Sequence, residues 1–391
     1  MIMTFFITLV LSYFLGSIPW SYLFTKLFSG KDLRKVGTKN VGSTNAWKEG
    51  GPIAGILSFL GDSTKGILAI FIAYMLGSSK SWWPLFVLLA IIGHSYPIWL
   101  KGKGGVGVAA AVGSFVVMFP LESAAFGILA GTLWLTFKKG IMFIISLLWP
   151  FVILIGYLRG TIDLLGAVMT LLLVSWLFIK GWNNLKNSFM EIKEPLKDNF
   201  VKRKLWRYLG LLYPGLAYPL WGPVVFRYII VISGLIAFFL ELIRRYSKRI
   251  NEFLKKLFKP VGKSDEAYKV SGTSYFLMGS AIAGLFPIPY SLISIVMLAL
   301  GDSWAVLVGE RWGKHKWLEG KSIEGSLACF AIAFASGAVY MNLINMPISY
   351  LNLLLGAIVA TIVEGLGKWL NDNLTMAPAA ALAMWLFSKI L

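Results

Sequence analysis

The chain has 391 residues, of which 57% are hydrophobic and only 14% are charged. Soluble globular proteins have about 25% charged residues, so this composition excludes a soluble globular protein as well as a disordered or fibrous chain. Lysine and arginine outnumber aspartate and glutamate by 37 to 18, a formal net charge of +19. Because the basic residues lie between apolar runs, they indicate cytoplasmic loops of a membrane protein and not a nucleic-acid-binding surface.

The first apolar run extends from Ile2 to about Phe28, which is too long for the core of a signal peptide. Basic residues follow it, so we expect the N-terminus outside the membrane and the first loop inside. Five further runs are each long enough to cross a hydrocarbon core of about 30 Å. They cover residues 52–78, 82–100, 106–137, 141–158 and 161–180. Pro120 and Glu122 interrupt the third of these, which could therefore be two short passes.

The composition changes at about residues 181–207, where charged residues replace the apolar run. We interpret this as the boundary between two helical membrane domains, residues 1–195 and 196–391. A basic amphipathic segment, Arg244 to Lys263, is expected to lie on the membrane surface. The other apolar runs of the second half cover residues 208–222, 224–243, 271–286, 288–308, 324–345, 347–365 and 376–390. The sequence therefore predicts an all-α, polytopic integral membrane protein with about 12–14 spans.

Three polar clusters lie at the ends of apolar runs or interrupt them in the first half. Residues 32–45 combine glycine, hydroxyl, amide and cationic groups, the set that can cradle a phosphate with backbone N–H donors. Residues 61–66 read Gly-Asp-Ser-Thr-Lys-Gly, and residues 93–105 contain Gly-His-Ser-Tyr-Pro followed by Lys-Gly-Lys-Gly-Gly. By composition alone, these clusters could equally be ordinary loops with turn-forming glycines.

The order of these motifs resembles the bacterial glycerol-3-phosphate acyltransferase family that uses acyl-phosphate as its donor, over about the first 195 residues. The matching segments are Leu15 to Pro19, Asp32 to Asn45 and Gly93 to Ala109. The resemblance implies seven spans, a site facing the cytosol, and acylation of the sn-1 hydroxyl of glycerol-3-phosphate to lysophosphatidic acid. For contacts with substrate and phosphate it implies Arg34, Thr38, Asn40, Asn45, His94, Lys101, Lys103, Gly104 and Gly105.

Several departures from the family pattern fall on expected phosphate contacts. Val106 stands where the family has a lysine, and Ala110 where it has a hydroxyl. The segment around Gly140 lacks the expected serine, and Gly181 stands where a histidine is expected. Each lost charge-assisted contact typically removes about 1.5–3 kcal/mol. A catalytically inactive acyltransferase-like scaffold is therefore an alternative for this half.

The second half carries its polar residues in a stretch from Gly301 to Ser326, with Asp302 at the end of an apolar run. Glu364 interrupts another run, and Asp372 opens the last one. Glycines and lysines close to carboxylates suit a nucleoside triphosphate and its magnesium. The alternative is that the glycines pack helices closely and the charges mark loop ends.

This stretch resembles the polyprenol kinase family, which includes dolichol, phytol and CTP-dependent diacylglycerol kinases, over about residues 202–391; Arg207 replaces a family histidine. The resemblance implies phosphorylation of a lipid alcohol by CTP or ATP with Mg²⁺. It implies catalytic roles for Asp302, Glu324, Asp372 and Lys321, with Asp302 and Asp372 as magnesium ligands. Phosphate-contacting residues would be Gly309, Gly313, Lys314, Ser322, Gly325 and Asn373.

Together the two halves predict a fusion enzyme of lipid biosynthesis in the cell membrane, with its sites facing the cytoplasm. A transporter, the remaining alternative, would show symmetric halves with charged pairs in the middle of broken helices. The polar groups lie at span ends instead, and the halves show no such symmetry.

Overall fold

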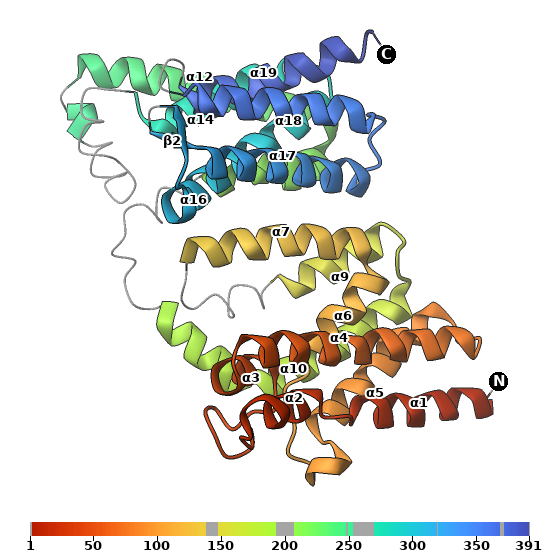
Figure 1. The fold of residues 1–391 in the computed structure, drawn as a ribbon. Coiled ribbons are helices and arrows are strands. Elements are labelled where there is room, and N and C mark those ends of the chain that lie inside the picture. Colours follow the sequence, from red (N-terminus) through yellow and green to blue (C-terminus); the bar gives the residue numbers. More distant parts are fainter. Residues whose placement is uncertain are drawn as a thin grey trace. The chain divides into compact units, whose positions relative to one another are not determined.

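The structure, a computed structural model, describes residues 2–137, 148–192, 207–247, 249–252, 270–318, 320–367 and 371–390 (Figure 1). The chain forms two compact units. The first unit comprises Met1–Phe126 and Gly140–Lys193, and the second unit comprises Gly127–Lys139 and Glu194–Leu391. Nearly every described element is a helix, which confirms the predicted all-α class. That the two halves are an acyltransferase-like and a kinase-like domain stays a prediction.

Prolines divide the apolar runs of the first unit into its helices. The run that begins at Ile2 breaks after Gly16 and resumes at Trp20, because Pro19 has no N–H to continue the helix. Pro120 likewise begins a new helix, at the interruption where the sequence left two short passes open. The helices are α1 (Ile2–Gly16), α2 (Trp20–Ser29), α3 (Ser43–Gly50), α4 (Pro52–Met75), α5 (Trp83–Ser95), α6 (Val108–Met118), α7 (Pro120–Phe137), α9 (Trp149–Leu158) and α10 (Leu164–Ile192), with 3₁₀ turns η1 (Lys80–Trp82) and η2 (Ile98–Leu100). Of α7, only the part up to Phe126 belongs to this unit, and the rest belongs to the second unit.

Glycines bring α1 and α5 into backbone contact. A Cβ atom placed on Gly16 would lie 2.0 Å from the carbonyl oxygen of Ala90, and one on Gly93 would lie 2.2 Å from that of Tyr13. Small residues allow such close approach between helices in a membrane. The C-terminal end of α1 is therefore fixed beside the C-terminal part of α5.

Two loops meet at one end of the first unit. Loop A (residues 30–42) precedes α3 and α4, and loop B (residues 96–107) joins α5 to α6. Because α4 leads away from loop A and α5 returns, both loops lie at the same end. Leu33, Val41, Ala46 and Leu100 form one buried apolar cluster there, which packs loop A against loop B.

The second unit packs its helices around the buried helix α15. All eight residues of α15 except Tyr290 are buried, in a cluster that includes Leu353, Ala357 and Met376 from neighbouring helices. Among the described residues of this unit, the strands form one short antiparallel hairpin. The elements are η3 (Leu209–Leu211), η4 (Tyr213–Ala217), α12 (Tyr218–Tyr246), α14 (Gly272–Gly284), α15 (Tyr290–Met297), η6 (Leu298–Asp302), α16 (Ser303–Trp312), β1 (Lys316–Leu318), β2 (Lys321–Ser322), α17 (Ile323–Leu343), α18 (Tyr350–Gly365) and α19 (Asp372–Phe387).

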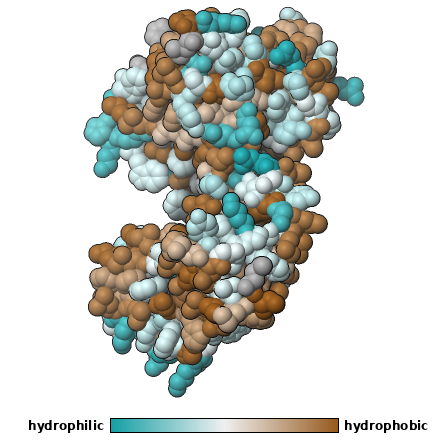
Figure 2. Space-filling view, turned by 90° about the vertical axis from the view of Figure 1, so that its right-hand side faces the viewer, coloured by the Kyte–Doolittle hydropathy of each residue, from teal (hydrophilic) through white to brown (hydrophobic). Residues whose placement is uncertain are grey.

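Long apolar helices and an apolar surface identify a multi-pass integral membrane protein. Hydrophobic residues cover most of the visible side of the first unit, the one that contains the N-terminus (Figure 2). Seven helical segments of the described chain are long and apolar enough to cross a membrane: Ile2–Ser29, Pro52–Met75, Lys80–Leu100, Leu164–Met190, Leu209–Tyr246, Tyr290–Trp312 and Ile323–Leu343. Shorter apolar helices such as Val108–Met118 and Tyr350–Gly365 accompany them, so the total of 12–14 spans remains a prediction.

Two sequence predictions fall partly on residues that the structure leaves out. Of the basic amphipathic segment, only residues 244–247 and 249–252 are described, and they are largely helical. The segment around Gly140 lies outside the described residues, as does the basic run at 202–204.

Candidate functional site

Loop A presents an arginine that is already paired with a neighbouring carboxylate. Nε and Nη2 of Arg34 donate to Oδ1 and Oδ2 of Asp32 at 3.0 and 2.7 Å. The guanidinium also lies 5.1 Å from the ring centroid of Tyr22. These hydrogen bonds from Arg34 lower the pKa of Asp32 to about 2. The cation is therefore held in place at the surface of loop A.

The side chain of Asn45 stabilises loop A by hydrogen bonds to its backbone. Its side chain is buried, and Oδ1 accepts a hydrogen bond from the backbone N–H of Thr38 at 3.1 Å. Its Nδ2 donates to the carbonyl oxygens of Val36 and Asn40 at 3.2 and 3.0 Å. Asn45, predicted to contact substrate, uses its amide to hold the loop, while Thr38 remains exposed and Asn40 half-buried on it.

Loop B runs back along the end of α5 with its glycines in close contact. The N–H groups of Gly104 and Gly105 donate to the carbonyl oxygens of Ser95 and His94, both at 3.2 Å. A Cβ atom on Gly104 would lie 2.0 Å from the His94 carbonyl oxygen, and one on Gly105 would lie 2.3 Å from Nε2 of His94. These glycines thus allow close packing, and their N–H groups form hydrogen bonds within the protein that hold loop B against the end of α5.

The two loops that carry the predicted residues touch each other. The carbonyl oxygen of Val41, in loop A, would lie 2.5 Å from a Cβ atom on Gly105 in loop B. Lys101 and Lys103 are exposed on loop B. Of the positions predicted to depart from the acyltransferase pattern, Val106 lies in loop B and Gly181 in α10 faces it, since a Cβ atom on Gly181 would lie 3.4 Å from Cγ1 of Val106.

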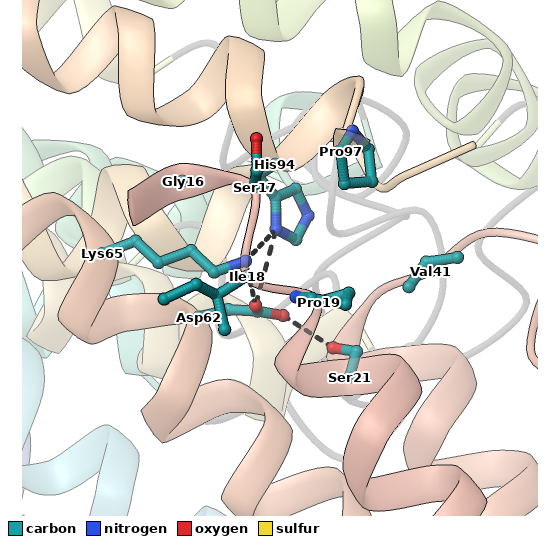
Figure 3. Close-up of a pocket in the computed structure, with 10 residues that line it drawn as sticks. All are labelled: Gly16, Ser17, Ile18, Pro19, Ser21, Val41, Asp62, Lys65, His94 and Pro97. Carbon is teal, nitrogen blue, oxygen red and sulfur yellow. Dashed lines mark hydrogen bonds and ion pairs between the residues drawn. The ribbon is translucent and has the colours of Figure 1, made fainter. Parts of the chain in front are cut away.

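A buried charged network lies beneath these loops (Figure 3). The Lys65 ammonium lies 2.7 Å from Oδ1 of Asp62 and 2.9 Å from Nδ1 of His94. Ser21 donates to Oδ2 of Asp62 at 2.6 Å. The sequence singled out the cluster at residues 61–66 but assigned no role to Asp62 or Lys65. Opposite charges three residues apart in an apolar helix were the available signal.

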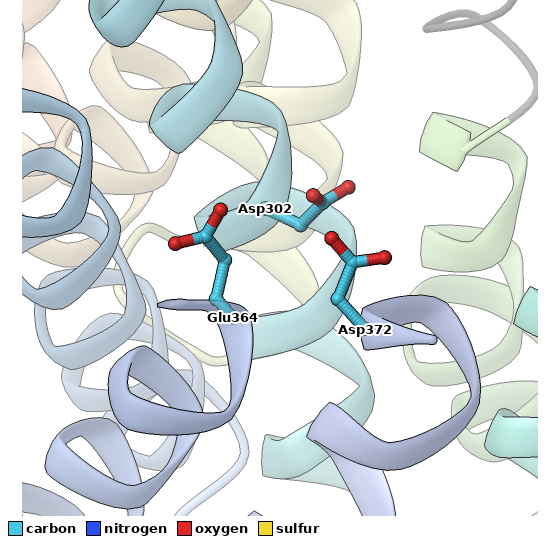
Figure 4. Close-up of side chains that lie close together, drawn as sticks. All are labelled: Asp302, Glu364 and Asp372. Carbon is cyan, nitrogen blue, oxygen red and sulfur yellow. The ribbon is translucent and has the colours of Figure 1, made fainter. Parts of the chain in front are cut away.

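In the second unit, three carboxylates converge (Figure 4). One oxygen from each of Asp302, Glu364 and Asp372 lies within 4.8 Å of the others. The π-helical turn η6 ends at Asp302, α18 carries Glu364 near its end, and Asp372 begins α19. Glu364 therefore lies beside two of the predicted carboxylates, Asp302 and Asp372. The sequence assigned no role to Glu364, because a single acid in an apolar run does not show which residue it contacts.

Two cations contact this group of acids. Lys321, on β2, bonds to Glu364 and lies 3.4 Å from Oδ2 of Asp372, while Arg207 bonds to Asp302. Burial alone would lower the pKa of Lys321, but the charges of Glu364 and Asp372 outweigh it and raise that pKa. With three ionised carboxylates and two cations, this group of side chains carries a formal net charge of −1.

The donor set fits a divalent cation. Oδ1 of Asp302 and Oε2 of Glu364 are buried and accept no hydrogen bond within the described residues. Unpaired carboxylate oxygens are costly in a buried place, and hard cations such as Mg²⁺ bind oxygen ligands of this kind. Asp302 and Glu364, each only 1% exposed, therefore offer one ligand atom each, with Asp372 beside them.

The other predicted residues of the second unit lie elsewhere. Glu324 accepts a hydrogen bond from Nδ1 of His315 at 2.7 Å, in the hairpin region. Nδ2 of Asn373 donates to Asp372 at 3.1 Å, and Lys314 is exposed. The remaining four residues lie where α16 packs against α17. Oγ of Ser322 caps α17 by accepting a hydrogen bond from the N–H of Gly325. The four residues are Gly309, Gly313, Ser322 and Gly325.

Comparison with known proteins places the first unit in a family. A family model described as glycerol-3-phosphate acyltransferase matches residues 6–190. Glycerol-3-phosphate acyltransferase 2 of Dehalococcoides mccartyi (strain ATCC BAA-2266 / KCTC 15142 / 195) is 37% identical over 206 residues, which cover 51% of this chain and 93% of that protein. The chain belongs to the glycerol-3-phosphate acyltransferase family. Loops A and B and the buried network all fall inside the residues that match the family.

Other relatives of this acyltransferase family align over shorter segments. The glycerol-3-phosphate acyltransferase of Syntrophomonas wolfei is 46% identical over 112 residues, 29% of this chain and 57% of that protein. The chain thus spans little more than half the length of this relative. The crystal structure of PlsY (YgiH), an integral membrane glycerol 3-phosphate acyltransferase in its glycerol 3-phosphate form, has 26% sequence identity, a TM-score of 0.43, and coverage of 47% of this chain and 92% of that one.

Proposed function

We propose that the first unit transfers an acyl group from acyl-phosphate to the sn-1 hydroxyl of glycerol-3-phosphate, forming lysophosphatidic acid and inorganic phosphate. The supporting observation is that loops A and B, both within the residues that match the family, meet at one end of the unit with Lys101 and Lys103 exposed. Acyl-phosphate is already activated, so alignment of the hydroxyl and neutralisation of the phosphates supply most of the catalysis.

The proposed chemistry needs no nucleophilic side chain. The substrate hydroxyl oxygen attacks the acyl carbonyl carbon, the carbon–oxygen bond to phosphate breaks, and phosphate leaves with the electron pair and takes up the hydroxyl proton. Arg34, Lys101 and Lys103 neutralise the two phosphate groups, while Thr38 and Asn40 orient glycerol-3-phosphate. Because these loops carry many basic residues, the positive-inside rule supports a site that faces the cytoplasm at the cell membrane.

The test is an assay of the purified full chain with acyl-phosphate and labelled glycerol-3-phosphate. Lysophosphatidic acid is expected from the parent, and the double variant Lys101→Ala/Lys103→Ala is expected to lose at least about tenfold in kcat/KM, since each lost phosphate contact removes about 1.5–3 kcal/mol. Lys80→Ala is the matched control, because Lys80 is exposed at the opposite ends of α4 and α5. No product from the folded parent would establish the inactive scaffold instead.

We also propose that the second unit phosphorylates a lipid alcohol, such as a polyprenol, phytol, farnesol or diacylglycerol, with CTP or ATP. The supporting observation is the convergence of Asp302, Glu364 and Asp372 beside Lys321. Phosphoryl transfer depends mainly on positioning and charge neutralisation. Asp302, Glu364 and Asp372 would hold Mg²⁺, which supplies charge to the phosphates, and Lys321 would hold the phosphate tail of the nucleotide.

The kinase proposal is tested with γ-labelled CTP or ATP and a panel of lipid alcohols in detergent. Labelled lipid phosphate is expected with one of the two nucleotides, and Glu364→Gln is expected to abolish it. Glu310→Gln, an exposed acid on α16, is the matched control and should retain activity. No lipid phosphate with either nucleotide and any of the alcohols would contradict the kinase assignment.

A further inference from the structure

Asp62 and Lys65 are an unusual pair to find inside a membrane span. Both lie on α4, within the apolar helix Pro52–Met75, and both side chains are only 1% exposed. Charged residues inside membranes are costly and mark functional positions unless they only stabilise the fold. A simple ion pair would satisfy both charges, but Lys65 also reaches a third group, Nδ1 of His94 on α5.

The network assigns the position of the hydrogen on His94. An ammonium group donates hydrogen bonds and accepts none, so in the 2.9 Å contact between Lys65 and Nδ1 of His94 the nitrogen Nδ1 is the acceptor. The Lys65 nitrogen also lies 2.7 Å from the Asp62 carboxylate, which only accepts, whereas Nδ1 is farther from Asp62, at 3.4 Å. A neutral imidazole whose Nδ1 accepts carries its hydrogen on Nε2.

His94 connects this network to both loops. Its carbonyl oxygen accepts the N–H of Gly105, and its Nε2 lies so close to Gly105 that only glycine fits there. The Val41 carbonyl of loop A reaches the same point. Nε2 lies on the side of the ring away from Lys65 (Figure 3). The N–H donor of His94 is therefore placed where loop A meets loop B.

We propose that Asp62 and Lys65 are positioning residues that hold His94 with its hydrogen on Nε2, so that this N–H donates to a phosphate oxygen of substrate bound between loops A and B. The inference rests on the proposed acyltransferase function and extends it by two residues that the family resemblance left without a role. Ser21, which donates to the other oxygen of Asp62, completes the support from α2.

The hydrogen position is measurable without catalysis, because the chain has only two histidines. The full chain with His315→Gln is labelled with ¹⁵N-histidine, which leaves His94 as the only labelled residue. We expect a protonated Nε2 and an unprotonated Nδ1, and a change in the Nε2 signal when glycerol-3-phosphate or inorganic phosphate is added. A hydrogen on Nδ1, or no change with either anion, would overturn the proposal.

Asp62→Asn/Lys65→Met tests the positioning role in the same His315→Gln background. Removing both charges avoids a lone buried charge, so the protein should still fold. We expect His94 to lose its single tautomer and KM for glycerol-3-phosphate to rise at least about tenfold, as expected when a charged hydrogen bond is lost. An unchanged tautomer and unchanged KM would show that the pair serves the fold alone.

Two substitutions of His94 separate donation to phosphate from structural support. His94→Asn places an amide near the position of Nδ1 and keeps an acceptor for Lys65, whereas His94→Gln extends an N–H donor to the position of Nε2. We expect the Gln variant to stay within about threefold of the parent and the Asn variant to lose at least about tenfold in affinity for glycerol-3-phosphate. The reverse order would indicate a structural role and contradict the proposal.

The two possible failures are distinguishable. If the parent forms no lysophosphatidic acid but phosphate changes the Nε2 signal of His94, the acyltransferase function fails and the donor role stands. If lysophosphatidic acid forms while His94→Asn binds glycerol-3-phosphate as the parent does, the function stands and the role of His94 is wrong.

Discussion

Removal of Lys65 alone should destabilise the first unit strongly. Lys65→Met leaves the Asp62 carboxylate without its cation, in a place where both side chains are only 1% exposed. At an effective dielectric constant of about 20, unit charges 2.7 Å apart attract by about 6 kcal/mol. The cost of burying both charges offsets part of this, and loss of one partner from a buried pair typically costs about 3–5 kcal/mol.

The expected change is large enough to measure by heating the purified protein in detergent. Each kcal/mol shifts the midpoint of a unit of about 150–250 residues by about 2–4 °C, so Lys65→Met should lower the midpoint by about 6–20 °C. Asp62→Asn/Lys65→Met removes both charges and should recover most of that loss. If the double variant is as unstable as Lys65→Met, the unpaired carboxylate is not the cause and the reasoning is refuted.

Three further predictions follow from contacts around the loops and the core of the second unit. Gly105→Ala should lower acyltransferase kcat/KM at least about tenfold, because its Cβ would lie 2.3 Å from Nε2 of His94. Gly127→Ala, whose Cβ would have nothing within 4 Å, should cost less, and steady-state kinetics compares the two variants. The pKa of Asp32 is lowered to about 2, so its pairing with Arg34 stabilises the fold above about pH 4 and is lost as pH falls toward 2. Asp32→Asn should therefore melt below the parent at pH 7, and the difference should vanish near pH 2; a difference that persists there would contradict the assignment. Cys329, the single cysteine, is fully buried and should react with a maleimide only when the second unit opens, so rapid labelling of the native protein would be inconsistent with the packing described.

The sequence predicts the helical membrane fold well, because apolar length and proline positions determine it directly. Pro120 marks a helix boundary at the interruption where the sequence left two short passes open, and Gly222, with a φ of 73°, interrupts α12 where two apolar runs were separated. The break at Pro19 is a different case. It lies inside one continuous apolar run, and only the turn formed by Ser17–Pro19 shows that α1 and α2 are separate helices.

The sites are less predictable, because a residue type does not state its partner. Asn45 has the chemistry to bind substrate, yet its amide is fully used by the backbone of loop A. Gly309, Gly313 and Gly325 suit a phosphate loop equally well, but they allow α16 and α17 to touch. Glu364 is distant in sequence from Asp302, and only the three-dimensional packing brings their carboxylates together.

The glycine contact between α1 and α5 determines how the site responds to its lipid surroundings. With backbone against backbone at Gly16 and Gly93, no deformable layer of side chains separates the two helices. A hydrophobic helix longer than the bilayer is thick can tilt, and these two helices would then tilt as one rigid body. The turn at Ser17–Pro19 and loop B then move together, so the geometry beneath the loops is insulated from changes in membrane thickness.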